Sequence, residues 1–163
     1  MKSVSDYTFL PVWGAAHIDE SNEVIALWMG AGGLTGQEAK RRISELVYII
    51  KHKSGRVVGA STAVKTYISQ LNNYLFAYRS LILTEFRAPA LDTQLIVRSK
   101  ELLQAAARDE KEKNCVGIIV VVQNEWIKQE WRQAKWSGAD MLYIGNSPEG
   151  HHLRVGYFKG AKI

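Results

Sequence analysis

The sequence has one cysteine, three prolines and no long apolar segment. A single cysteine excludes any disulfide within the chain, which favours a reducing, cytoplasmic setting. The longest apolar run, 115–122, is far shorter than the roughly 20 residues of a transmembrane helix, so we expect no membrane partner. The first residues lack the apolar core of a secretory signal peptide. Paired histidines, His151 and His152, lack companions at metal-ligand spacing, so we expect no metal site.

The composition is that of a globular protein with a basic surface. Its 163 residues suit one domain, 1–163, and five Trp, seven Tyr and four Phe supply core material that a disordered chain would lack. The net charge of +5 favours an anionic partner such as CoA, a phosphorylated substrate or nucleic acid. A basic surface that only keeps the protein in solution explains the same charge.

β-rich and helical segments alternate along the chain. The Gly55 turn joins two β-rich runs into a hairpin, and the continuous β-branched run 115–122 is typical of a buried parallel strand. The order therefore predicts an α/β fold with a mixed, mostly antiparallel central sheet and helices on both faces. We expect strands at 7–13, 47–52, 57–67, 74–83, 115–122, 140–144 and 153–158, and helices at about 21–29, 36–46, 93–113 and 125–136.

Capping residues mark three helix starts. Thr35 with Glu38 forms a capping-box pattern, Asp92 or Thr93 precedes the longest helical run, and Asn124 precedes the last. These side chains accept hydrogen bonds from first-turn N–H groups, which predicts where each helix begins.

Four stretches in this order carry a family resemblance. The hairpin 54–59, the segment 81–87, the loop 87–92 and the strand ending at Val122 before Asn124 resemble the GCN5-related N-acyltransferase (GNAT) superfamily. The likeness covers about residues 47–145. It implies an acyl-CoA N-acyltransferase fold, acetyl-CoA or another acyl-CoA as cosubstrate, and a primary amine as acceptor.

The resemblance also implies a cofactor site in which Ile82 and Leu83 lie beside the thioester and a loop binds the CoA pyrophosphate. Arg87 matches the loop motif, but Asp92 replaces its last small residue and Pro89 removes an N–H group. At an effective dielectric near 20, a carboxylate about 4 Å from a phosphate repels it by roughly 4 kcal/mol. The implied cofactor residues are Ile82, Leu83, Arg87, Ala88, Ala90, Leu91, Asp92 and Thr93.

Glu85 is the implied general base, because it lies just past the strand that precedes the loop. The tyrosine that protonates the leaving thiolate is missing, since Ala134 or Trp131 stands where the register expects it. Tyr143 is a substitute from a strand, as are Tyr78 and Tyr157. Asn124 either orients a ligand or only caps its helix.

Two alternatives stay open. The altered loop fits an acyltransferase-like scaffold that binds a protein partner instead of CoA. Alternatively, the protein binds or modifies nucleic acid, because aromatic and basic side chains alternate along the last predicted helix, as in surfaces that stack bases. These side chains are Trp126, Trp131 and Trp136, with Lys128, Arg132 and Lys135.

Overall fold

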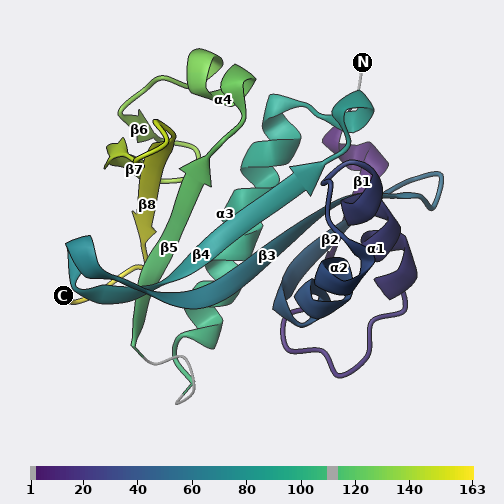
Figure 1. Ribbon diagram of the computed structural model, residues 1–163, viewed down its shortest axis with the longest axis horizontal. Coiled ribbons are helices and arrows are strands. Elements are labelled where there is room, and N and C mark those ends of the chain that lie inside the picture. The colour runs from purple at the N-terminus through teal and green to yellow at the C-terminus, as the bar shows by residue number, and fades with distance from the viewer. Residues whose placement is uncertain (1–2, 110–113) are drawn as a thin grey trace. The chain divides into compact units, whose positions relative to one another are not determined.

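The computed structural model describes residues 3–109 and 114–163, in which eight strands form one sheet (Figure 1). The strands are β1 (Tyr7–Pro11), β2 (Leu46–His52), β3 (Val57–Ile68), β4 (Asn73–Ile82), β5 (Cys115–Val122), β6 (Lys135–Trp136), β7 (Met141–Asn146) and β8 (His152–Tyr157). The helices are α1 (Ser21–Gly30), α2 (Gly36–Arg42), α3 (Pro89–Ala106) and α4 (Glu125–Glu130), with short 3₁₀ helices at Val4–Asp6, Ile43–Glu45, Ser69–Leu71 and Thr84–Phe86. Within these residues, no helix is both long and apolar enough to cross a membrane.

The sheet is mixed and mostly antiparallel, as predicted. Its strand order is β1-β2-β3-β4-β5-β8-β7-β6. Pairing is antiparallel at β1–β2, β2–β3, β5–β8, β7–β8 and β6–β7, and parallel at β4–β5. The parallel pair includes the β-branched run Cys115–Val122, whose predicted bounds are confirmed.

The chain divides into two compact units. The first contains residues 3–63 and 80–102, and the second contains 64–79, 103–109 and 114–163. Strands β3 and β4 and helix α3 contribute residues to both units. One domain over 1–163 stays a prediction.

Helices cover both faces of the sheet in the first unit. Ile49 and Ile50 are adjacent on β2, so their side chains point to opposite faces. Ile49 packs with Val24, Leu27 and Trp28 of α1, whereas Ile50 packs with Leu91 and Leu95 of α3. Figure 1 shows α1 and α2 beside β2. The prediction of helices on both faces is thereby confirmed in this unit.

The second unit is built around β5 and β8. Leu75, Val116, Ile119 and Val155 form a buried cluster. Gly117 allows the two strands to approach, because a Cβ there would lie against the carbonyl of Gly156 and 2.9 Å from the Cα of Tyr157. A side chain at this position would therefore force the two strands apart.

Three predicted helix bounds are wrong. Helix α2 ends at Arg42 and continues only as a 3₁₀ turn, so it does not reach Leu46 as an α-helix. Helix α3 starts at Pro89, so Asp92 lies in its first turn and is not its cap. Proline suits the first helical position, because its φ is preset and its missing N–H is not needed there. The helix ends at Ala106 and a turn follows; the predicted continuation over 110–113 lies outside the described residues.

The last helix is also shorter than predicted. Helix α4 ends at Glu130 rather than near Trp136, and the chain then turns to form β6. The reason is tertiary: Trp136 pairs with Met141 of β7, and this pairing draws residues 135–136 out of the helical path.

Candidate functional site

A tight turn joins β4 to α3 in the first unit. The N–H of Leu83 donates to the carbonyl of Val58 at 2.8 Å, which holds the end of β4 against β3. The N–H groups of Phe86 and Arg87 then donate to the carbonyls of Leu83 and Thr84 at 2.8 and 3.2 Å. These bonds form the turn that precedes α3, in which Arg87 is two residues before the first helical residue.

The first turn of α3 has few N–H groups to offer an anion. Pro89 has none, and the N–H groups of Leu91 and Asp92 donate to the carbonyl of Ala88 at 2.9 and 3.2 Å. Among the bonds described, the N–H of Ala90 has no acceptor. The glycine-rich cradle that the resemblance implies is therefore replaced by a regular helix opening.

Arg87 and Asp92 form a close, poorly bonded pair at this opening. Arg87 Nε lies 3.8 Å from Asp92 Oδ2, and the two side chains are 19% and 9% exposed. The distance exceeds hydrogen-bond range, and both atoms are buried without a hydrogen-bond partner in the described part of the chain. Burial raises the pKa of Asp92 to about 6, although the positive charge of Arg87 opposes this shift.

The apolar residues of the predicted cofactor site belong to the core. Ile82 and Leu91 are 2% and 1% exposed, and both pack in the cluster that joins β2 and β3 to α3. Leu83 and Ala88 pack against the same cluster. Ile82 and Leu91 therefore present only backbone atoms to a ligand, whereas Leu83 and Ala88 are partly exposed. Thr93 lies on the next position of α3 after Asp92.

Glu85 is an exposed, paired carboxylate. Its Oε1 lies 3.4 Å from Nη2 of Arg56, and both side chains are 57% exposed. The guanidinium of Arg56 also lies 5.5 Å from the centre of the Phe86 ring. The geometry thus gives Glu85 a partner on the β2–β3 turn, and its role as a base stays a prediction.

An aromatic cluster beside this loop was not predicted. The rings of Tyr7 and His52 lie 5.2 to 6.4 Å from that of Phe86 and 5.4 Å from each other. Tyr7 and His52 are directly opposite in the β1–β2 register. Burial raises the pKa of the Tyr7 hydroxyl, and the neighbouring charge of Asp6 adds to this. No local pattern in the sequence indicates this cluster, because Tyr7 and His52 are 45 positions apart in the chain.

The remaining predicted residues, Asn124 and Tyr143, belong to the second unit. Asn124 caps α4, since its Oδ1 accepts from the N–H of Ile127 at 3.1 Å. The Tyr143 hydroxyl donates to Oδ1 of Asn146 at 3.0 Å, and its side chain is 42% exposed. No recorded contact joins Asn124 to Tyr143 in the described residues.

The predicted alternation of aromatic and basic side chains along the last helix is wrong, because the helix ends too early. Only Trp126 lies in α4; Trp131 follows the helix and Trp136 lies in β6. Their rings contact in sequence, with centres 6.4 and 5.3 Å apart. Of the cations, Lys128 pairs with Glu125 and Lys135 pairs with Asp140. These ion pairs reduce the charge that the surface offers to nucleic acid.

Arg154 organises this region, although no sequence pattern indicated it. The side chain is 1% exposed, and its guanidinium carbon lies 4.0 Å from the centre of the Trp136 ring. Its two terminal nitrogens donate to the carbonyls of Trp131 and Ala134 at 3.1 and 3.4 Å. The arginine thereby holds the segment after α4 against β8.

No metal centre is assembled in the described part of the chain, where no group of three or more histidine, cysteine or acidic side chains comes together.

Comparisons with known proteins identify the fold. No protein-family model matches the sequence, and neither does any curated protein. A GNAT-family acetyltransferase from Streptococcus pneumoniae is 11% identical with a TM-score of 0.61, over 94% of this chain and 99% of that one. The ribosomal-protein-S5-alanine acetyltransferase from Vibrio fischeri is 10% identical with a TM-score of 0.58, over 99% and 98%.

A third similar structure is a mutant AtaT toxin bound to the C-terminus of the antitoxin AtaR and acetyl-CoA. It is 15% identical, with a TM-score of 0.58 over 94% of each chain. The chain therefore has the fold of the GNAT acetyltransferases, and the predicted resemblance is confirmed at the level of the fold. At these identities the likeness shows the fold alone, since one fold hosts many functions.

Proposed function

We propose that the protein is an acyl-CoA-dependent N-acyltransferase that transfers an acetyl or other acyl group to a primary amine. The observation that carries the proposal is Arg87 at the opening of α3, in a chain with the GNAT fold. A guanidinium beside a helix N-terminus suits a pyrophosphate, because both the side chain and the helix dipole favour negative charge.

Asp92 would regulate this donor site. When ionised, its carboxylate competes with a phosphate for Arg87 and repels it. When protonated, it releases Arg87 and removes the repulsion. Because the pKa of Asp92 is raised to about 6, we expect acyl-CoA affinity to increase as the pH falls through this value. Arg87 and the N–H of Ala90 would bind the pyrophosphate, and the backbone of Ile82 and Leu83 would lie beside the thioester.

In the reaction, the acceptor amine attacks the thioester carbonyl, a base removes the proton of the amine, and the CoA thiolate leaves and is protonated. Glu85 stays the predicted base, Tyr143 the predicted acid and Asn124 a predicted ligand contact. The acceptor would be the amine of a small molecule, a protein or a modified nucleobase.

The test is calorimetric titration with acetyl-CoA at pH 5.5 and 7.5. We expect the wild-type protein to bind acetyl-CoA one-to-one, with an affinity about tenfold or more weaker at pH 7.5 than at pH 5.5. Roughly half the repulsion between two charges about 4 Å apart is enough for this difference. Asp92→Asn should bind equally at both pH values, beyond any change that the ligand's own phosphates cause. Asp19→Asn is the matched control, because Asp19 is an exposed aspartate whose side chain is 87% accessible.

The second candidate is a scaffold that binds a protein partner. It is favoured by the observation that Arg87, Glu85 and Asn124 each have a partner within the chain. A similar solved structure shows a toxin bound to the C-terminus of an antitoxin. Absence of acetyl-CoA binding by both folded wild type and Asp92→Asn, at millimolar ligand and both pH values, would exclude the acyltransferase and leave the scaffold. Nucleic-acid binding would instead weaken steeply with salt.

A further inference from the structure

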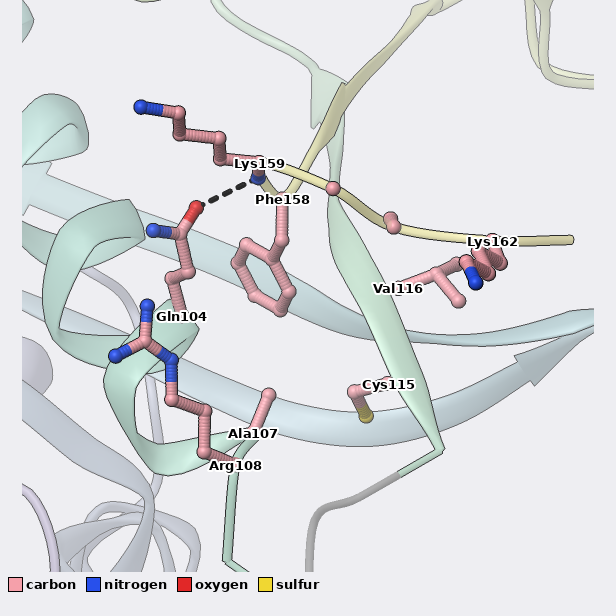
Figure 2. Close-up of a pocket in the computed structure, with 10 residues that line it drawn as sticks. Gln104, Ala107, Arg108, Cys115, Val116, Phe158, Lys159 and Lys162 are labelled. Atoms are coloured by element: carbon pink, nitrogen blue, oxygen red, sulfur yellow. Dashed lines mark hydrogen bonds between the residues drawn. The ribbon is translucent and has the colours of Figure 1, made fainter.

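A pocket of about 300 Å³ lies in the second unit (Figure 2). It is formed by the end of α3 and the turn after it, the start of β5 and the segment that follows β8. Its volume is at the lower end of the roughly 300–1,000 Å³ typical of small-molecule sites. None of its residues belongs to the loop that opens α3, so it is independent of the proposed donor site.

The described charged residues that line this pocket are all positive. They are Arg108, Lys159 and Lys162, and none of the described lining residues is acidic. None of the three forms a recorded ion pair with the rest of the described chain, unlike Lys128 or Lys135. Three cations without counter-charges favour an anionic ligand, and the planar fork of an arginine suits phosphate or carboxylate oxygens.

Backbone geometry orients the polar side of the pocket. Oε1 of Gln104 accepts from the N–H of Lys159 at 2.7 Å, which Figure 2 shows as a dashed line. The Gln104 amide group is therefore held with its NH₂ as a remaining donor. The N–H of Ala161 donates to the carbonyl of Phe158 at 3.0 Å and closes a turn in which Gly160 has a φ of 76°. This left-handed conformation favours glycine and fixes the course of the chain between the two lysines.

The other side of the pocket is apolar. Phe158 and Val116 are 6% and 9% exposed, and the Phe158 ring lies 6.2 Å from that of Phe76. Cys115 and Ala107 complete the apolar lining. In Figure 2 the Phe158 ring stands between the α3 residues and β5. These side chains are nearly buried, so only their exposed edges contact the organic part of a ligand whose anion lies toward the cations.

We propose that this pocket binds a small organic phosphate, in which a phosphate monoester is joined to a flat apolar body. A phosphate monoester fits better than a carboxylate, because it carries close to two negative charges and three acceptor oxygens, and the lining offers cations on more than one side of the pocket. The site takes a ligand in addition to acyl-CoA and the amine acceptor.

The test uses phenyl phosphate as probe, with calorimetry on the full chain. We expect saturable binding that weakens about tenfold in Arg108→Gln, as loss of a charged hydrogen bond predicts, and about threefold in Lys162→Gln, as loss of an exposed charge predicts. Lys40→Gln is the matched control, since it removes an exposed lysine of α2 that does not line the pocket. All three substitutions are at exposed positions, and circular dichroism checks that each variant is folded.

Cys115 provides a second readout without any mutation, because it is the one cysteine of the chain and it lines the pocket. Phenyl phosphate should slow its reaction with a thiol reagent in wild type, and less so in Arg108→Gln. No saturable binding at millimolar phenyl phosphate would overturn the proposal. So would equal weakening by Lys40→Gln and Arg108→Gln. If inorganic phosphate binds as tightly as phenyl phosphate, the proposal that the ligand has an apolar body is wrong.

Discussion

The two units bury charge in opposite ways. In the second unit, the cation of Arg154 lies over the Trp136 ring and donates to two backbone carbonyls. In the first unit, the carboxylate of Asp92 lies 3.8 Å from Arg87, and its buried Oδ2 has no hydrogen bond in the described chain. Both side chains are at least nine-tenths buried.

The difference teaches that burial alone does not decide whether a charge stabilises a fold. A buried charge is tolerated when hydrogen bonds and favourable electrostatics replace the water it loses. Arg154 has such replacements at its two terminal nitrogens and over the Trp136 ring, although its buried Nε has no hydrogen-bond partner in the described chain, and it has a structural role. Asp92 lacks them, which raises its pKa to about 6 and leaves it able to change charge near neutral pH. A poorly satisfied charge at a candidate ligand site is consistent with function, not stability.

Arg154→Met should cause the largest effect. It removes two hydrogen bonds to the segment after α4 and the contact with Trp136. The two carbonyls keep their bonds from Trp136 Nε1 and the Tyr143 N–H, so the loss is that of the arginine's own contacts. We expect the free energy of unfolding to fall by about 3–4 kcal/mol, measured by urea denaturation. The free energy of unfolding of Arg154→Lys, which retains the charge but not the planar guanidinium, should lie between those of the wild type and Arg154→Met. Wild-type stability in Arg154→Met would show that the two units do not differ in this way.

Asp92→Asn should have the opposite effect and increase the free energy of unfolding. Its folded pKa of about 6 exceeds the ordinary value of 3.8, so the folded chain holds this proton more tightly than the unfolded chain. The stability that protonation provides is complete below pH 3.8, decreases as the pH rises to about 6, and is absent above it. Removing the charge should therefore stabilise the protein at pH 8 by about 2 kcal/mol. The pKa of Asp92 is raised by roughly two units, and local relaxation of the structure reduces the corresponding free energy.

Urea denaturation at pH 4 and pH 8 measures this difference. The gain should shrink as the pH is lowered, because protonated Asp92 resembles asparagine. An equal gain at both values would mean that Asp92 does not titrate between them. Asp19→Asn, the exposed control, should change stability little at either pH.

Asn124→Ala tests a polar group of the second unit that remains at the surface. Loss of its bond to the N–H of Ile127 should lower the free energy of unfolding by about 1 kcal/mol. Acetyl-CoA affinity should not change if the residue only caps α4. If acetyl-CoA affinity falls although the variant is folded, Asn124 is a ligand contact as well as a cap. Asn124→Ser, which retains a capping oxygen, separates the two roles.

Glu85→Gln should have the smallest effect on stability. The pair with Arg56 is more than half exposed, and such pairs contribute about 0–1 kcal/mol. If Glu85 is the base, turnover should fall while acetyl-CoA affinity is retained. Arg56→Gln is the matched control, because it breaks the same ion pair and leaves the carboxylate. Equal turnover in wild type and Glu85→Gln would remove Glu85 as the base.

Local signals in the sequence predicted much of the fold. The Thr35 and Asn124 side chains cap their helices as predicted, because a cap depends on residues within one turn. The run 115–122 became a strand with the predicted bounds, since its β-branched residues suit a sheet that is buried on both faces. The order of elements then pointed to a resemblance that the solved structures confirm at the level of the fold.

By itself, the sequence determined the order of strands and helices except for β6, and the identity of the loop before α3, since both follow from neighbouring residues. Only the tertiary structure decided that α4 ends at Glu130, that Arg154 lies over Trp136, and that Asp92 is buried beside Arg87. Each of these depends on what a side chain meets after the chain has folded. Burial, which sets the pKa of Asp92, is a property of that surrounding structure and has no signature in the neighbouring sequence.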